Sequence, residues 1–464
     1  MADINLGVGG ANSATGGYDI DNSVKTEAGN QEWFYRNNPT QGNRQTFTFS
    51  LWHKRTQITG YPADPYLMSQ GSNARFHITG NTNPTLRFMW DGNSTELESS
   101  PRIRDTAAWY HIVLAVDTTQ ATASNRVKLY VNGEQISWDN SGYPSQNSTS
   151  TWMSTTDMYF NVYNGDGAYD ASGYYAEICV IDGQQLAPTS FGEFDSVSGI
   201  WKPIDVSGLT FGNEGFYLDF EDSSDLGADV SGNNNDCTLN NIAAADQATD
   251  TPTNNFAVLN TLHNIPDTTR KEGATATVKN NNSWRTIVST LGVSSGKWYF
   301  EMSAGSEYTM VGVAGDAVFG GGTANQNYIG AHTGSIGYYG NTATFYQDGV
   351  DKSPTNVSGF VADDIIGFAF DADNKKIYFH KNGTYQNSAN PNTSSNGYSV
   401  TGDAPFFLGF ATYQQADQCE ANFGGYHVYS ISSGNSDANG YGNFEYAVPS
   451  GYYALCTKNL AEYG

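Results

Sequence analysis

Two loops in the first half of the chain combine aromatic rings with short polar side chains. Residues 137–152 and 163–175 contain Trp and Tyr surrounded by Asn, Asp, Ser, Gly and Gln. Sugars present apolar C–H faces together with many hydroxyls, so aromatic rings flanked by hydrogen-bonding groups suit them. We predict a ligand-binding surface of glycan-binding chemistry on these loops, with the candidate residues Trp138, Tyr143, Trp152, Tyr163 and Tyr169.

The second half offers comparable loops at residues 320–328 and 338–346, where Tyr328 and Tyr339 are the candidate contacts. Two other interpretations stay open for these aromatic residues. Trp138 and Trp152 flank their loop and could pack beneath it, while the tyrosines could simply cover the edges of the fold. The rings could also contact a protein, because Tyr, Gly and Asn are typical of adaptable protein-binding surfaces.

Two segments place carboxylate and amide oxygens at the short spacing that a hard cation such as Ca2+ needs. Residues 164–170 contain Asp166 and Asp170, the candidate calcium ligands, and residues 229–236 begin and end with Asp. Neither segment matches the EF-hand pattern, and Asx-rich segments often form turns through their own side-chain hydrogen bonds. We expect no cofactor, with Ca2+ as the one candidate exception.

No spacing of residues favours catalysis. A glycosidase needs two carboxylates facing one groove, and alternate residues of a strand face the same way. Glu177 and Asp182 are five residues apart and face opposite sides, while Asp219 and Glu221 share a face where a strand enters an acidic segment. The histidines show no HExxH or HxH spacing, and no GxSxG motif is present. We expect a protein that is not an enzyme, with a glycan depolymerase as the least favoured alternative.

The charge balance excludes two classes of partner. Lys and Arg total 22 and Asp and Glu total 47, so the formal net charge is −25. Nucleic-acid phosphates and anionic membrane surfaces attract basic proteins, so we expect neither as a partner. Residues 1–17 lack both a basic residue and an apolar stretch, and runs such as 112–116 and 365–370 are too short for a bilayer. No signal peptide and no membrane insertion are therefore expected.

Period-two alternation of apolar and polar residues predicts strands in both halves, for example at residues 46–52 and 127–131. Asn-Gly pairs at 132–133 and 382–383 follow strand-like runs and predict tight hairpins. The helices we expect are short, near 188–194 and 242–247. The four cysteines are widely spaced without a CxxC, which favours free, buried thiols. Many short strands predict an all-β chain with two antiparallel β-sandwiches in series.

Shifts in composition suggest where these sandwiches begin and end. We place the first sandwich at residues 1–222 and the second at residues 270–428. Residues 223–269 are rich in Asp, Asn, Ser and Ala, and we interpret them as an ordered bridge. Residues 429–464 start with a Gly/Ser/Asn stretch and end in a short apolar segment, which we interpret as a C-terminal tail.

The first half resembles the laminin-G-like, concanavalin A-type lectin fold, a jelly roll. The order of its motifs is also similar to a module in structural proteins of tailed bacteriophages, where a segment like Asp-Thr-Pro-Thr-Asn-Asn-Phe at 250–256 closes the module. The segments that carry this resemblance are residues 46–52, 108–117, 127–136, 177–186, 191–193, 199–201 and 215–220.

The second half resembles a SPRY domain, itself a two-sheet sandwich. Its Gly-Lys-Trp-Tyr-Phe-Glu-Met segment at 296–302 is similar to the first SPRY strand, and residues 448–460 resemble the ends of phage tail and virion proteins. The segments between them follow in the expected order: residues 311–313, 335–339, 364–371, 376–384 and 406–410.

Together the two resemblances imply a virion protein of a tailed phage, made in the host cytoplasm. We expect it to act in host recognition as a tail fibre or receptor-binding subunit that contacts a host-surface glycan or protein, beside other virion proteins. Analogy implies a homo-oligomer, namely a trimer. A capsid-decorating or tail-docked structural protein without a receptor role is the alternative, because the first sandwich begins early and leaves little room for a shaft.

Overall fold

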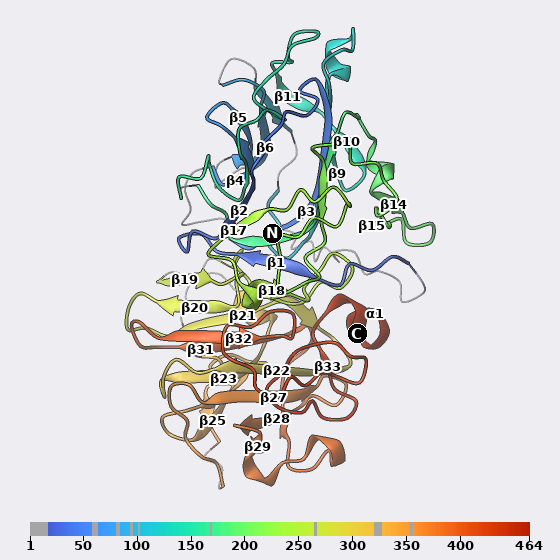
Figure 1. Cartoon of the computed structure of the whole chain (residues 1–464). Coiled ribbons are helices and arrows are strands. Elements are labelled where there is room, and N and C mark those ends of the chain that lie inside the picture. Colours follow the sequence, from blue (N-terminus) through green and yellow to red (C-terminus); the bar gives the residue numbers. More distant parts are fainter. Residues whose placement is uncertain are drawn as a thin grey trace. The chain divides into compact units, whose positions relative to one another are not determined.

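The computed structural model describes residues 17–57, 64–79, 84–92, 96–100, 103–167, 169–263, 267–319, 327–352 and 356–464. The backbone divides into two compact units, and the division falls between Asn254 and Asn255. Strands dominate both units (Figure 1), so the prediction of an all-β chain with two antiparallel sandwiches is confirmed. Among the described residues, no helix combines the length and apolarity needed to cross a membrane.

The described part of the first unit contains two eight-stranded antiparallel sheets. Sheet I has the order β10-β9-β8-β3-β13-β1-β18, with β16 beside β13, and sheet II has the order β11-β7-β6-β5-β4-β12-β2-β17. The strands of sheet I are β1 (Ser23–Thr26), β3 (Thr46–Arg55), β8 (Tyr110–Asp117), β9 (Val127–Val131), β10 (Glu134–Ile136), β13 (Gly173–Asp182), β16 (Phe216–Leu218) and β18 (Gln247–Ala248). Those of sheet II are β2 (Trp33–Arg36), β4 (Tyr66–Gln70), β5 (Ala74–Thr79), β6 (Thr85–Met89), β7 (Glu96–Ser99), β11 (Trp138–Ser141), β12 (Met158–Phe160) and β17 (Thr238–Asn240). A separate hairpin joins β14 (Gly192–Phe194) and β15 (Trp201–Pro203).

Alternation along the strands explains the core of the first unit. In β3, Phe47, Phe49 and Leu51 face the core between the two sheets, as period two requires. The run in β8 is more continuous because its other face is also covered: Val113 packs in a second cluster with Phe191, Val206, Phe211 and Tyr217. A strand buried on both faces needs apolar residues on both.

Residues 223–254 complete the first unit and do not form a separate bridge, so this part of the predicted division is wrong. Strand β17 extends sheet II, and β18 pairs with β1 in sheet I. Downstream, the Asp250 carboxylate lies 2.7 Å from Lys54 Nζ and accepts a 3.0 Å hydrogen bond from the Trp109 indole. Residues from 255 onward belong to the second unit.

The second unit is a sandwich of a nine-stranded sheet III and a six-stranded sheet IV in its described part. Sheet III has the order β19-β20-β32-β22-β27-β28-β29, with β30 beside β28 and β33 beside β22, and sheet IV has the order β21-β31-β23-β24-β25-β26. The strands of sheet III are β19 (Thr268–Lys271), β20 (Ala276–Lys279), β22 (Lys297–Ser303), β27 (Ile365–Asp371), β28 (Lys376–Lys381), β29 (Thr384–Tyr385), β30 (Tyr398–Ser399), β32 (Gln418–Asn422) and β33 (Tyr453–Ala454). Those of sheet IV are β21 (Arg285–Val293), β23 (Thr309–Gly315), β24 (Ile336–Tyr339), β25 (Thr344–Gln347), β26 (Val350–Asp351) and β31 (Phe406–Thr412).

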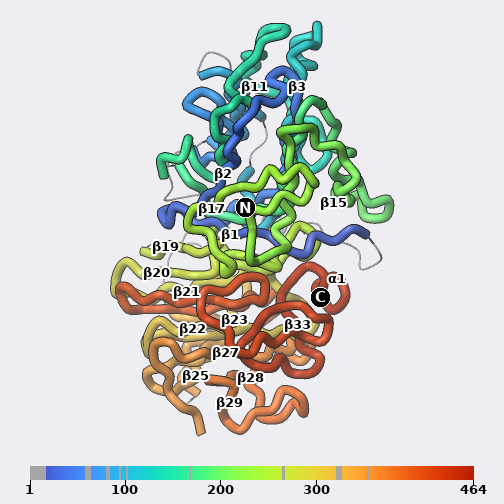
Figure 2. Tube along the Cα trace, in the orientation of Figure 1, coloured from blue at the N-terminus to red at the C-terminus, as the bar shows by residue number. Residues whose placement is uncertain are grey.

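Residues 429–464 are built into this second sandwich, which corrects the prediction of a separate tail. Strand β33 pairs in parallel with β22, and the red C-terminal trace passes beside it (Figure 2). The buried Glu301 carboxylate accepts 2.9 Å hydrogen bonds from the backbone N–H groups of Glu445 and Tyr446. Phe444 and Tyr452 are buried as well.

The described helices are short, as expected. The 3-10 turns are η1 (Ala123–Asn125), η2 (Pro188–Ser190), η3 (Ala244–Asp246), η4 (Asp316–Phe319), η5 (Gln386–Ser388) and η6 (Pro391–Thr393), and α1 spans Thr457–Tyr463. Both predicted Asn-Gly hairpins form, with φ of 49° and 82° at residues 132–133 and 45° and 75° at residues 382–383. The four cysteines are buried thiols, which agrees with the expectation from their spacing.

Candidate ligand-binding surfaces

Sheet IV carries an aromatic surface on its outer face. Along β24 and β25, Tyr338 and Phe345 point into the core, so Tyr339 and Tyr346 point outward. Trp284 precedes β21, Tyr308 precedes β23 and Tyr413 follows β31, while Tyr328 comes from the loop before β24. These residues form one group, here called the aromatic platform: Trp284, Tyr308, Tyr328, Tyr339, Tyr346 and Tyr413.

The rings of the aromatic platform are continuous. The Trp284 ring has centroid distances of 5.5–5.8 Å to Tyr328, Tyr339 and Tyr413. Tyr346 extends the group with distances of 5.3 Å to Tyr328 and 6.4 Å to Tyr339. All six side chains are half-buried or exposed. Such spacing is that of interacting aromatic pairs, and it leaves ring surface available to a ligand.

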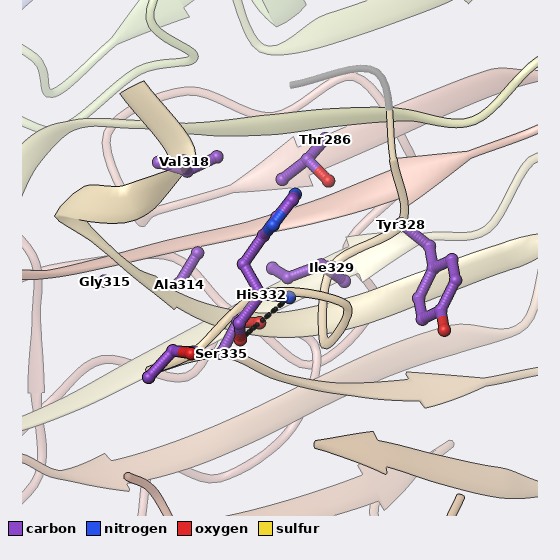
Figure 3. Close-up of a pocket in the computed structure, with 9 residues that line it drawn as sticks. Thr286, Ala314, Gly315, Val318, Tyr328, Ile329, His332 and Ser335 are labelled. Carbon is purple, nitrogen blue, oxygen red and sulfur yellow. Dashed lines mark hydrogen bonds between the residues drawn. The ribbon is translucent and has the colours of Figure 1, made fainter. Parts of the chain in front are cut away.

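Glycines let a loop approach sheet IV beside the platform. A Cβ on Gly337 would lie 2.3 Å from the Ile329 carbonyl oxygen, so only glycine allows this loop backbone to lie on β24. Ile329 and His332 of this loop line a pocket together with Thr286 and Ala314, and the Ser335 hydroxyl donates to the His332 carbonyl (Figure 3). Tyr328 lies in this loop directly before Ile329. The position of the Tyr328 ring therefore depends on the close packing of the loop against β24.

Polar groups border the platform. Exposed Gln414 and Gln415 follow Tyr413, and the Gln415 backbone N–H donates to the Asn282 side-chain oxygen over 2.6 Å. Burial raises the pKa of the Tyr339 hydroxyl, and Tyr308, Tyr346 and Glu307 reinforce the shift. Tyr339 therefore stays a neutral hydrogen-bond donor and acceptor at neutral pH.

The structure brings the predicted residues Tyr328 and Tyr339 together through Trp284, which sequence reasoning missed. Tyr308 and Tyr413 were missed as well, whereas Tyr346 ends a predicted loop. The signal for Trp284 was weak, because it stands alone before β21 with no other aromatic residue near it in sequence. Residues 320–326 of the predicted loop 320–328 lie outside the described residues.

The first unit places two predicted tyrosines in a smaller cluster on sheet II. Tyr163 and Tyr169 lie 5.2 Å and 5.6 Å from the Tyr66 ring, and the Arg75 guanidinium lies 5.1 Å above Tyr163. Tyr169 is 40% exposed, whereas Tyr66 is buried. The cluster therefore offers a narrower aromatic surface than the platform of the second unit.

The three aromatic candidates of loop 137–152 support its fold. Trp152 is buried between Phe49 and Phe88 and donates its indole N–H to the Met89 carbonyl, so the prediction of ligand contact is wrong for Trp152. Trp138 and Tyr143 are half-buried and pack against the same core. The interpretation of rings packed beneath their loop is the one the geometry favours here.

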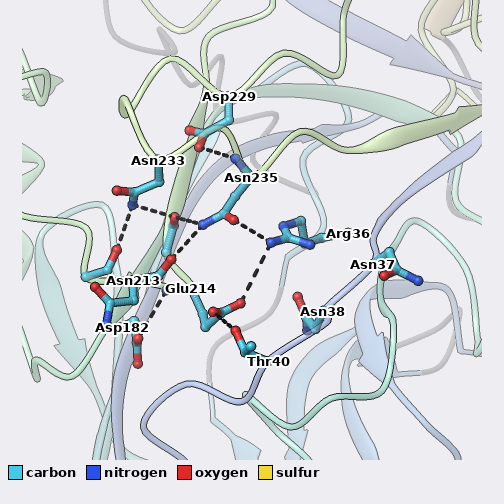
Figure 4. A network of polar contacts seen from close by, with 12 residues as sticks. Arg36, Asn37, Asn38, Thr40, Asp182, Asn213, Glu214, Asp229, Asn233 and Asn235 are labelled. Carbon is cyan, nitrogen blue, oxygen red and sulfur yellow. Dashed lines mark hydrogen bonds and ion pairs between the residues drawn. The ribbon is translucent and has the colours of Figure 1, made fainter.

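In the second calcium candidate, residues 229–236, side-chain oxygens already accept hydrogen bonds from the protein itself. The Asp229 carboxylate accepts N–H groups of Tyr217, Ser231 and Asn235 at 2.8–2.9 Å. The Arg36 guanidinium donates to the Asn235 side-chain oxygen and lies 3.7 Å from Glu214 (Figure 4). Backbone N–H groups thus occupy the oxygens of Asp229, and the Arg36 guanidinium occupies the side-chain oxygen of Asn235.

The candidate calcium ligands Asp166 and Asp170 differ in their surroundings. Asp166 is exposed, whereas Asp170 is buried and accepts the Gly29 N–H over 3.0 Å. Burial raises the pKa of Asp170. Within the described ranges, no three His, Cys, Asp or Glu side chains lie close enough together to hold a metal ion.

The acidic pairs weighed for catalysis lie in structural positions. Glu177 is buried and accepts hydrogen bonds from the Tyr18 and Tyr217 hydroxyls, the latter at 2.8 Å. Asp219 follows the end of β16 and caps a turn by accepting the Glu221 N–H over 3.1 Å. One carboxylate of the pair Asp219 and Glu221 is therefore hydrogen-bonded to the backbone of its own turn.

Two family models match the chain. The model described as the concanavalin A-like lectin/glucanases superfamily matches residues 28–182, and the SPRY domain model matches residues 297–426. The chain therefore carries a concanavalin A-like domain followed by a SPRY domain, as the sequence resemblance predicted. Each match lies inside one compact unit. The first domain is lectin-like and the second is a SPRY domain, and these two types indicate binding functions.

Several solved structures are similar to parts of the chain. A human SPRY domain is 16% identical with a TM-score of 0.26 and covers 34% of this chain and 96% of its own. The SPRY domain of human HERC1 is 17% identical with a TM-score of 0.28, covering 35% and 96%. A putative carbohydrate binding protein from Bacteroides ovatus is 14% identical with a TM-score of 0.31, covering 48% and 59%. No curated protein matches the chain.

Proposed function

We propose that this chain is a non-enzymatic virion protein of a tailed phage, and that it recognises the host by binding a surface glycan on the aromatic platform. The pair of lectin-like and SPRY domains supports a binding role. The order of motifs that resembles phage structural proteins supports the virion setting. The observation that carries the proposal is the continuous group of rings around Trp284.

The composition of the platform narrows the class of glycan. Ring faces bind the C–H faces of a sugar, and the bordering amides and tyrosine hydroxyls bind its hydroxyl groups. The chain carries a net charge of −25, which repels anionic polysaccharides at long range. An uncharged glycan therefore suits this surface. A homo-oligomer, for which we propose a trimer, would add avidity to contacts that are weak one by one.

Binding to cells tests the proposal. Labelled full-length protein is incubated with a panel of bacterial strains and with arrayed neutral glycans, and phage adsorption is measured in its presence. We expect saturable binding that blocks adsorption. Trp284→Ala removes the central ring and should weaken binding about tenfold or more, since buried aromatic anchors carry much of the energy of a contact surface.

The matched control is Phe194→Ala, which removes a 47% exposed ring outside the aromatic platform and should leave binding unchanged. Circular dichroism must show that both variants are folded. If the folded wild-type protein binds no strain and no glycan, the receptor role is wrong. A capsid-decorating or tail-docked role would then replace it.

A further inference from the structure

A buried lysine lies between two carboxylates in the first unit. Lys25 Nζ is 2.9 Å from Glu32 Oε2 and 2.8 Å from Asp246 Oδ1. The three side chains are 2%, 6% and 11% exposed, respectively. Lysine, aspartate and glutamate are rarely buried. The Lys25 amine is therefore held in contact with the Asp246 carboxyl group, and the Glu32 carboxyl group contacts the same nitrogen atom.

The backbone holds each member of this group in place. Lys25 lies in β1, and Asp246 ends η3 directly before β18, which pairs with β1. Asp246 Oδ2 accepts the Ala243 N–H over 2.9 Å, so the carboxyl group presents its other oxygen to Lys25. Glu32 accepts the Glu27 N–H over 2.8 Å. Such preorganisation converts a bimolecular condensation into an intramolecular one.

Charge in this group favours movement of a proton. One ammonium and two carboxylates would leave a net negative charge away from water, which is costly. Burial raises the pKa of Glu32, although Lys25 opposes that shift. A proton passed from Lys25 to Glu32 leaves a neutral amine, which is the nucleophilic form, beside a carboxylic acid.

We propose that Lys25 and Asp246 are joined by an intramolecular isopeptide bond, and that Glu32 carries the protons for its formation. Glu32 first relays the proton it has taken from Lys25 to an Asp246 oxygen, and the lone pair of Lys25 Nζ then attacks Cγ of the resulting Asp246 carboxylic acid and forms the C–N bond. Glu32 takes a proton from the nitrogen and gives one to the departing hydroxyl, which leaves as water. The sum is –NH2 plus –COOH giving –CO–NH– plus H2O, so no oxidant, reductant or other co-reactant is needed.

A solvated group of the same composition shows what burial contributes. Lys202 Nζ lies 3.2 Å from Glu193 and 3.4 Å from Asp195, but Glu193 is 59% exposed. The two carboxylates raise the pKa of Lys202, which keeps the amine protonated. Lys202 therefore stays an ammonium in a surface ion pair and forms no amide.

The proposed bond closes the first unit at its ends. It joins β1, the first strand, to the residue directly before β18, the last strand of that unit. Force or heat that separates these two strands would act on a covalent link as well as on the two backbone pairs between β1 and β18. Such a link suits a protein that must resist mechanical load or proteolysis.

Mass spectrometry of the denatured full-length protein tests the proposal directly. We expect the intact mass to be lower than the sequence mass by one water, about 18 Da, and a proteolytic digest to contain a branched peptide joining Lys25 to Asp246. Lys25→Arg and Glu32→Gln should each restore the full mass. The matched control Lys202→Arg should keep the mass deficit.

Two outcomes would overturn the proposal without depending on whether a variant folds. One is wild-type protein of full mass, whose digest contains the Lys25 and Asp246 peptides separately; the group is then an ion cluster. The other is a water loss located within a single linear peptide. A deficit that persists in Glu32→Gln would overturn the role of Glu32.

Discussion

At the scale of single residues, two buried carboxylates, Glu177 and Glu301, accept hydrogen bonds from tyrosine hydroxyls and have no ion-pair partner among the described residues. Glu301 accepts from the Tyr299 and Tyr429 hydroxyls at 2.7 Å and 3.2 Å, and Glu177 accepts from Tyr18 and Tyr217. Neutral donors satisfy the oxygens but supply no positive charge. Burial therefore raises the pKa of both carboxyl groups, that of Glu177 to about 7.

The raised pKa of Glu177 predicts a pH dependence of stability. The folded state binds this proton more tightly than the unfolded state, whose Glu has its ordinary pKa of 4.5. The free energy of unfolding should therefore fall as pH rises from about 4.5 to about 7, by roughly 3 kcal/mol, and then level off.

Urea denaturation at pH 5 and pH 8 measures this effect. Glu177→Gln cannot ionise, so its loss of stability between the two pH values should be smaller than that of the wild type. The exposed Glu193→Gln serves as the control and should follow the wild type. Equal losses in all three proteins would contradict the prediction.

At the scale of elements, sheet IV positions the aromatic platform through a row of glycines. Gly409, Gly312 and Gly337 are paired across β31, β23 and β24 on the outer face. Side chains there would collide with neighbouring backbone, since a Cβ on Gly312 would lie 1.9 Å from the Ile336 carbonyl oxygen. The strands and the loop before β24 can therefore approach one another closely.

Gly337→Ala tests the dependence of the platform on this row. The new Cβ pushes the loop that carries Tyr328 away from β24, and we expect a loss of about 1–3 kcal/mol in stability. Weaker ligand binding should accompany it. Gly315→Ala is the matched control in β23, because its Cβ would find its nearest neighbour at 3.5 Å. Chemical denaturation measures the free energy of unfolding of both variants. Equal values for Gly337→Ala and Gly315→Ala would show that Gly337 does not hold the loop.

At the scale of the whole molecule, the last segment of each unit supplies partners for buried groups or strands that lie far from it in sequence. The first unit needs residues up to 254, because Asp250 partners Lys54, a side chain with no exposed surface. The second needs its C-terminal residues, because β33 and the backbone at 445–446 bind sheet III. Truncation within either segment leaves buried groups without their partners.

Fragments cut at two alternative positions test these boundaries. Residues 15–254 should fold alone, whereas residues 15–222 should be unstable, because removing one member of a buried ion pair alone costs about 3–5 kcal/mol. Likewise, residues 255–464 should fold and residues 255–428 should not. Thermal unfolding followed by circular dichroism is the measurement. A cooperative transition in 15–222 would contradict the division at 254.

Local patterns in the sequence predicted much of this architecture. Period-two alternation identified strands such as β3 and β9, and both Asn-Gly pairs predicted hairpins that form. These features depend on neighbouring residues alone, through side-chain direction and backbone sterics. The order of such motifs was also enough to predict a concanavalin A-like domain and a SPRY domain in series.

Only the tertiary structure decided which distant residues meet. Alternation determines that Tyr339 points opposite to Tyr338, but not that β24 lies near Trp284. Alternation likewise did not decide whether Trp152 lies on the loop surface or in the core. It also gave no sign that Lys25 and Asp246 meet, because most of the first unit lies between them in sequence. Strand neighbours are selected by packing of the whole sheet, because contacts distant in sequence depend on every element between them.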